Sequence, residues 1–141
     1  MTDPSVAKAL GYMKSEMGVR SVGAVGYTFG SKYVTRFMRK GAGIEVGFVV
    51  DASFVTEEEW GGISGPICVA AGAKDHVFST EERHGTEKIL QTLGVPYQMT
   101  VYSQAGHGFA ARGDVLKKEV KVAKQQAFHQ AVAWFDAFLR P

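Results

Sequence analysis

A short apolar run that ends in a glycine-flanked turn is the feature that most restricts how this chain can fold. Residues 19–27 carry mostly small and branched apolar side chains without the polar alternation of a half-exposed strand. That pattern predicts a strand covered on both faces, as in a parallel sheet. The turn Gly26-Tyr27-Thr28-Phe29-Gly30 follows at once, and residues 29–40 show the apolar spacing of a helix. The 26–30 turn therefore joins a strand to a helix and carries Thr28 at its apex.

The residue types in the 26–30 turn suit a reactive site. We expect Gly26 and Gly30 to leave room for close helix–strand packing, where a Cβ atom would clash. The apex residue Thr28 is predicted to store backbone strain and to hold its hydroxyl clear of the sheet. The N–H of Phe29, at the helix start, would face an oxyanion, and Tyr27 beside it is a candidate substrate contact.

Further apolar runs alternate with helical patterns along the chain. Strands are predicted at 44–50, 67–71 and 97–102, and the intervening segments 51–66 and 103–115 are predicted as loops. Asp3 is the expected cap of a first helix that begins at Pro4, and Ser79 with Glu82 has the spacing of a capping box that opens a helix running to about residue 92. A last helix is expected over 116–139. This order predicts a three-layer α/β fold with about four parallel strands flanked by helices, in one domain over residues 1–141.

Composition narrows the classes of function. The net charge is +2 and the charged residues, 21% of the chain, are scattered, so neither nucleic acid nor a membrane surface is an expected partner. No apolar stretch approaches the roughly 20 residues of a membrane span. The single cysteine, Cys68, lies in a predicted strand as a small buried side chain and is compatible with a reducing, cytoplasmic setting. The four histidines lack metal-ligand spacing, so no metal or cofactor is expected.

Three polar residues follow three of the predicted strands. Thr28 comes after the first, Asp75 after the third and His107, between two glycines, after the fourth. In an open α/β sheet the carboxyl ends of the strands form the ligand-binding edge. Asp75 would hold His107 in one tautomer, and His107 would take a proton from the Thr28 hydroxyl. A structural alternative exists for each, since Thr28 and Asp75 are also ordinary turn residues.

The chain also resembles the dienelactone hydrolase family, within the α/β-hydrolase fold. The resemblance rests on residues 23–30, Ser53-Phe54-Val55, residues 71–78, residues 103–109 and Ala133-Trp134-Phe135, which together span nearly the whole chain. It implies an enzyme that acts on a lactone or a small ester-like metabolite through Thr28, Asp75 and His107. The resemblance is to the fungal members in particular, some of which belong to secondary metabolism. It also places Arg112 where the family carries an arginine for an anionic substrate, although a solvated surface arginine is the equal alternative.

Two departures from the family bear on function. The family's nucleophile at the turn is a cysteine, and here the residue is Thr28, a weaker nucleophile with a crowding β-methyl group. Family members are also longer at the N-terminus, so the resemblance is to the C-terminal half, a truncated α/β-hydrolase. Residues 22–27 should then form an exposed apolar edge, which would pair with a second copy in a homodimer or with a separate N-terminal half.

The residues leave other functions and roles open. One alternative to hydrolysis is an isomerase or cyclase of secondary metabolism that uses His107 without a covalent intermediate, and another is an inactive binding or interaction module. Asp51, at a strand end, is either a pocket carboxylate or a turn residue, the latter being the preferred interpretation. The acidic run at 57–59 belongs either to a lid or to a solvated loop.

Overall fold

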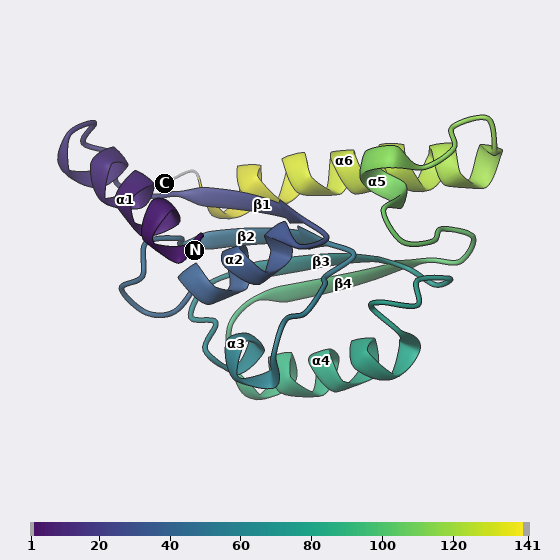
Figure 1. The fold of residues 1–141 in the computed structure, drawn as a ribbon, viewed down its shortest axis with the longest axis horizontal. Helices are drawn as coiled ribbons and strands as arrows, with labels where there is room; N and C mark the ends of the chain where they lie inside the picture. Colours follow the sequence, from purple (N-terminus) through teal and green to yellow (C-terminus); the bar gives the residue numbers. More distant parts are fainter. Residues whose placement is uncertain (1, 140–141) are drawn as a thin grey trace.

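Four parallel strands form the centre of the molecule, which was obtained as a computed structural model and is described for residues 2–139. The strands are β1 (Gly23–Tyr27), β2 (Val46–Val50), β3 (Ile67–Gly72) and β4 (Tyr97–Tyr102), and their order in the sheet is β1-β2-β3-β4. Because all of the pairings are parallel, the carboxyl ends of the strands share one edge of the sheet, at the right of Figure 1. The predicted α/β class and strand number are confirmed.

Helices cover both faces of this sheet (Figure 1). Their bounds are α1 (Asp3–Ser15), α2 (Gly30–Phe37), α3 (Glu57–Gly61), α4 (Thr80–Thr92), α5 (Phe109–Arg112) and α6 (Lys118–Phe138). One apolar core joins α1, α2, α3 and α4 to one face, and a second core joins α5 and α6 to the other. Alternate residues of β2 feed the two cores: Val49 points into the first, and Phe48 and Val50 point into the second. These layers fix the strand ends where the candidate residues lie.

The strand β1 lies at an edge of the sheet. Among the described residues it pairs with β2 alone, in the register Gly23↔Val46 to Tyr27↔Val50. Unlike β2 and β3, which are buried along their whole length, β1 leaves Val25 and Tyr27 47% and 41% exposed. The sequence was right about an apolar edge here. It was wrong in suggesting that the whole of 19–27 is a strand covered on both faces, since the strand begins only at Gly23.

Four local predictions need correction. The segment 51–66 contains the short helix α3, opened by a capping box between Thr56 and Glu59, and the segment 103–115 contains the single turn α5. Asp3 is not the cap of α1. Thr2 holds that position without a side-chain hydrogen bond, and the Asp3 carboxylate instead pairs with Arg36. The helix after the 26–30 turn ends at Phe37, and not at residue 40.

The last helix, α6, is only partly covered by the sheet. Ala123, Ala127 and Trp134 of α6 are buried against the sheet, whereas Phe128, Val132 and Phe138 are exposed. Of these exposed residues, Phe128 lines a groove together with Tyr27 of β1. Within residues 2–139 no helix is long and apolar enough to cross a membrane.

Candidate active site

The 26–30 turn holds Thr28 in a strained conformation. Its φ is +50°, in the left-handed region that β-branched residues avoid. Hydrogen bonds with both neighbouring segments fix it there: the Thr28 N–H donates to Val50 O at 2.8 Å, and the Thr28 carbonyl accepts from Ser31 N at 3.1 Å and Ser53 N at 3.2 Å. Such strain persists only where the surroundings enforce it, and it is typical of functional sites. The expectation of a strained apex at Thr28 is confirmed.

Gly26 and Gly30, the two glycines of the 26–30 turn, have different roles. A Cβ atom at Gly26 would lie 2.7 Å from the backbone of Gly30 and Ser31, because the end of β1 and the start of α2 touch there. The Ser31 hydroxyl adds to this contact by donating to Gly26 O at 3.0 Å. At Gly30, by contrast, a Cβ atom would have no neighbour within 4 Å. The steric explanation is therefore confirmed for Gly26 and is wrong for Gly30.

Asp75 and His107 are brought into direct contact. Asp75 Oδ2 lies 2.8 Å from His107 Nδ1, and the carboxylate is buried. Its other oxygen, Oδ1, accepts hydrogen bonds from Val77 N at 2.7 Å and Phe78 N at 3.1 Å. Because the carboxylate is anchored by two backbone N–H groups, it can fix the orientation of the imidazole, with Nδ1 toward Asp75 and Nε2 free to act on a substrate.

The loops that carry this pair are packed closely together. Lys74 N donates to Ala105 O at 2.9 Å, and Ala73 N donates to Tyr102 O at 2.9 Å. A Cβ atom at Gly72 would lie 2.5 Å from Ala105 O, so a glycine is needed where the two loops approach. The contact between Asp75 and His107, 32 residues apart, follows from the parallel pairing of β3 with β4.

A second carboxylate, Asp51, lies beneath these loops. It is completely buried, with φ +48°, and its two oxygens accept from Gly72 N at 3.2 Å and Gly108 N at 2.8 Å. Burial raises the pKa of Asp51 to about 6, and the nearby Asp75 carboxylate adds to this rise, while the two N–H donors oppose it. The preferred interpretation of Asp51 as a simple turn residue is too weak, because the side chain links two other loops.

The remaining candidate residues are less closely connected. Across residues 2–139 no hydrogen bond joins the Thr28 hydroxyl to His107. Arg112 is exposed and lies over Gly108, where an added Cβ atom would come within 3.0 Å of Arg112 Nε. Phe29 is the N-cap residue of α2, and its ring is exposed and edge-on to Tyr33.

Cavities near these residues differ in character. A cavity of about 340 Å³ borders His107. Its polar lining includes Lys74 after β3, Asp114 after α5 and Glu119 of α6. An apolar groove of about 420 Å³ lies between β1 and α6 and contains Tyr27. A larger cavity of about 830 Å³, between the 52–57 segment and α4, borders neither Thr28 nor His107. Of these three, the polar cavity is the one that borders the His107 side chain held by Asp75.

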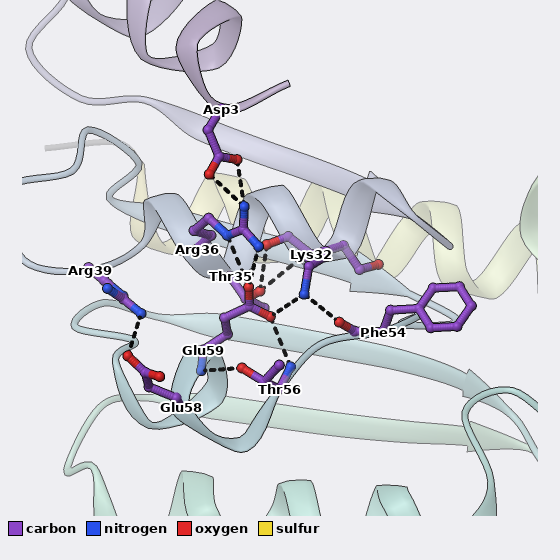
Figure 2. Close-up of polar contacts among 10 residues, drawn as sticks. Asp3, Lys32, Thr35, Arg36, Arg39, Phe54, Thr56, Glu58 and Glu59 are labelled. Carbon is purple, nitrogen blue, oxygen red and sulfur yellow. Dashed lines mark hydrogen bonds and ion pairs between the residues drawn. The ribbon is translucent and has the colours of Figure 1, made fainter. Parts of the chain in front are cut away.

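A network of charges fastens α2 to the segment that follows Asp51. Figure 2 shows the Glu59 carboxylate accepting from Lys32 Nζ at 2.9 Å, from Arg36 Nη2 at 2.7 Å and from Thr56 N at 2.9 Å. Lys32 Nζ also donates to Phe54 O at 2.6 Å. Burial by itself would raise the pKa of Glu59, but the Thr56 N–H and the two cations outweigh it and lower that pKa. The network therefore holds the helix that follows Thr28 against the 51–56 segment.

The charge network around Glu59 corrects the prediction for the acidic run 57–59, and part of it could have been predicted from the sequence. The acidic run 57–59 is neither a lid nor a wholly solvated loop, since Glu59 is buried while Glu58 is exposed. The spacing of Thr56 and Glu59 already matches a capping box, which places Glu59 near the Thr56 N–H. The ion pairs with Lys32 and Arg36 cross more than twenty residues and had no sequence signal.

Other reactive groups lie outside the site. Cys68 is buried in β3, where burial raises the pKa of its thiol to about 12, so it is a core residue as predicted. Among the described residues no group of three or more histidine, cysteine, aspartate or glutamate side chains could hold a metal ion.

Comparisons with a family model and with curated proteins point to the same family. A sequence model of the dienelactone hydrolase family matches residues 3–139. The chain is 45% identical over 138 residues to a protein named hydrolase tropI of Talaromyces stipitatus, covering 98% of this chain and 54% of that protein. It is 30% identical over 117 residues to dienlactone hydrolase 1 of Gibberella moniliformis, covering 83% of this chain and 45% of that protein. The chain thus spans about half the length of these curated relatives.

Solved structures show the same fold. An esterase of Pyrococcus furiosus superposes with a TM-score of 0.77 at 11% identity, covering 98% of this chain and 62% of that one. A dienelactone hydrolase-like promiscuous phosphotriesterase from metagenomic libraries superposes with a TM-score of 0.73 at 19% identity, covering 92% and 58%. At these identities the likeness concerns the fold alone.

Proposed function

Since the chain belongs to the dienelactone hydrolase family, we propose that it carries the catalytic loops of a hydrolase for a lactone or a small ester-like metabolite. The observation that supports this most directly is the buried Asp75 carboxylate 2.8 Å from His107 Nδ1. A carboxylate anchored by two N–H groups and aimed at an imidazole is the arrangement that prepares a histidine as a general base. Its relatives are named as hydrolases, and the resemblance described above extends the proposal to a small molecule of secondary metabolism.

In the proposed mechanism, the Thr28 hydroxyl attacks the carbonyl carbon while its proton passes to His107 Nε2. The Phe29 N–H stabilises the oxyanion that forms, and Asp75 stabilises the imidazolium. The intermediate collapses as the alkoxide leaves and takes the proton from His107, so that a lactone ring opens. A water molecule, deprotonated by His107, then hydrolyses the acyl–threonine ester and regenerates Thr28. Arg112, over Gly108, would bind an anionic group of the substrate, and Tyr27 would contact its apolar part.

A second candidate is an isomerisation or cyclisation in which His107 transfers protons without a covalent intermediate. The absence of a hydrogen bond between the Thr28 hydroxyl and His107 within residues 2–139 favours it. Threonine is also a weak nucleophile beside the cysteine of the family.

Turnover of p-nitrophenyl acetate and of a small lactone separates the two candidates. Hydrolysis through Thr28 predicts that Thr28→Ala and His107→Ala each lower kcat by at least about 100-fold, that Thr28→Cys raises it, and that the exposed control His84→Ala leaves it unchanged. If Thr28→Ala retains turnover while His107→Ala abolishes it, the second candidate gains. If neither substitution matters, the chain is better described as a binding module.

The edge of β1 bears on how the site is completed. Its Val25 and Tyr27 side chains are exposed beside the apolar groove with Phe128, and the curated relatives are about twice as long as the matched region. We expect this edge to pair with a strand of the N-terminal half of the family fold, which would also supply a second oxyanion donor. Mixing the chain with the N-terminal half of the Talaromyces relative should yield a 1:1 complex by light scattering, and Val25→Lys should abolish it. A homodimer that persists in the mixture would point to self-pairing instead, and a monomer would refute both.

A further inference from the structure

Asp51 joins three segments that carry the candidate catalytic residues. Its Oδ1 accepts from Gly72 N, at the end of β3 and three residues before Asp75. Its Oδ2 accepts from Gly108 N, the residue directly after His107. Both contacts reach across the sheet from the end of β2, over 21 and 57 residues of sequence.

The backbone around Asp51 provides the third connection. Val50 O accepts from Thr28 N, and Ser53 N donates to Thr28 O, so residues 50–53 hold the 26–30 turn. Asp51 N in turn donates to Ala70 O of β3 at 3.0 Å. Residues 50–53 are therefore hydrogen-bonded to the segments that carry Thr28, Asp75 and His107.

We infer that Asp51 is a positioning residue that sets the place of the His107 ring relative to Asp75 by clamping the N–H of Gly108. The inference rests on the proposed function in one respect, that His107 is the working base. Gly108 is the N-cap residue of α5 and has φ +77°, so the chain changes direction just after His107. A bond from that N–H to a buried carboxylate is charge-assisted and geometrically strict. A shift of this turn moves the ring, and a misplacement of about 1 Å can cost about 100-fold in rate.

The charge on Asp51 can change near pH 6. The ionisable groups that act on it are Asp75, from the loop after β3, and His107, from the loop after β4. The neighbouring residues of the 26–30 turn and α2, Thr28 and Ser31, are neutral. Because the pKa of Asp51 is raised to about 6, the bond to Gly108 changes from a neutral to a charged acceptor as the pH rises through that value.

Amide resonances test this clamp without reference to turnover. In the unaltered protein, the N–H protons of Gly72 and Gly108 should shift together with a common midpoint near pH 6, because both donate to one carboxylate. In Asp51→Asn that shared transition should vanish although His107 is still present, and the Gly108 N–H should exchange with solvent at least about tenfold faster, because an amide offers one acceptor oxygen in place of two. Ser53→Ala, which removes a hydroxyl bonded to Asp51 O but leaves the carboxylate, should retain the shared transition.

Kinetics and NMR together separate the failure of this inference from failure of the proposed function. The clamp predicts that Asp51→Asn lowers kcat about 10- to 100-fold with KM changed less than threefold, and that the His107 Nδ1 proton resonance moves. If His107→Ala leaves turnover intact while the amide transition is present, the proposed function fails and the clamp stands. If Gly72 and Gly108 titrate with separate midpoints, or if Asp51→Asn leaves the Gly108 amide unchanged, the inference is overturned. The comparison of the Gly72 and Gly108 midpoints uses the unaltered protein, so it tests the inference even if Asp51→Asn does not fold.

Discussion

Replacing Gly26 by alanine tests the close contact on which the 26–30 turn depends. The added Cβ atom would lie 2.7 Å from Gly30 C, Gly30 O and Ser31 N, all of them backbone atoms that no side-chain rotation can move away. Relief requires the start of α2 to shift from β1, which also stretches the 3.0 Å bond from the Ser31 hydroxyl to Gly26 O. Overpacking typically costs 1–3 kcal/mol, and we expect about 3 kcal/mol here because the clash is with backbone. For a domain of this size that lowers Tm by about 10 °C.

Gly30→Ala is the matched control, four residues away in the same turn. A Cβ atom there meets nothing within 4 Å, and alanine is the better helix former, so the free energy of unfolding should rise by up to about 1 kcal/mol. Urea unfolding, followed through the fluorescence of Trp60 and Trp134, measures both variants against the parent. Equal stability of Gly26→Ala and the parent, or equal losses in the two variants, would refute the steric account of the turn.

Two further predictions concern buried carboxylates. Glu59→Ala should lower the free energy of unfolding by about 2–3 kcal/mol, because it removes the buried carboxylate that Lys32, Arg36 and the Thr56 N–H share and leaves Lys32 without an anionic partner, although Arg36 keeps its pair with Asp3. Glu58→Ala, whose partner Arg39 is exposed, should change it by less than about 0.5 kcal/mol in the same urea experiment. A larger effect at Glu58 would contradict the network. The folded-state pKa of Asp51, about 6, lies above the unfolded value of 3.8, so its contribution to stability is fully present below about pH 4 and is lost as the pH rises through 6. Relative to Asp51→Asn, the parent should therefore lose about 2.5 kcal/mol between pH 4 and pH 7.5. Parallel pH profiles of the two proteins would show that Asp51 is not the titrating group.

Much of the fold could be predicted from local pattern. The strand 97–102 and the capping box between Ser79 and Glu82 were predicted correctly, because apolar runs and cap spacing act over a few residues. Helix α3 was missed although Thr56 and Glu59 signal it, since five residues are too few to show helical periodicity. The prediction for Gly30 was wrong because a glycine is needed only where a Cβ atom would meet other atoms. Which atoms lie there depends on how the helix and strand pack, and at Gly30 there are none within 4 Å.

For the candidate site, the sequence by itself determined that Thr28, Asp75 and His107 follow parallel strands and so share one edge of the sheet. It also determined that Asp75 and His107 are suited to act as a pair, and their 2.8 Å contact agrees with this. Only the tertiary structure decided that Asp51 is completely buried with both oxygens bonded to other loops, and that Glu59 is enclosed by two cations. The reason is physical: strand order and cap spacing are properties of neighbouring residues, whereas desolvation and hydrogen bonding of a buried carboxylate depend on segments that are distant in sequence and meet only when the sheet and helices pack.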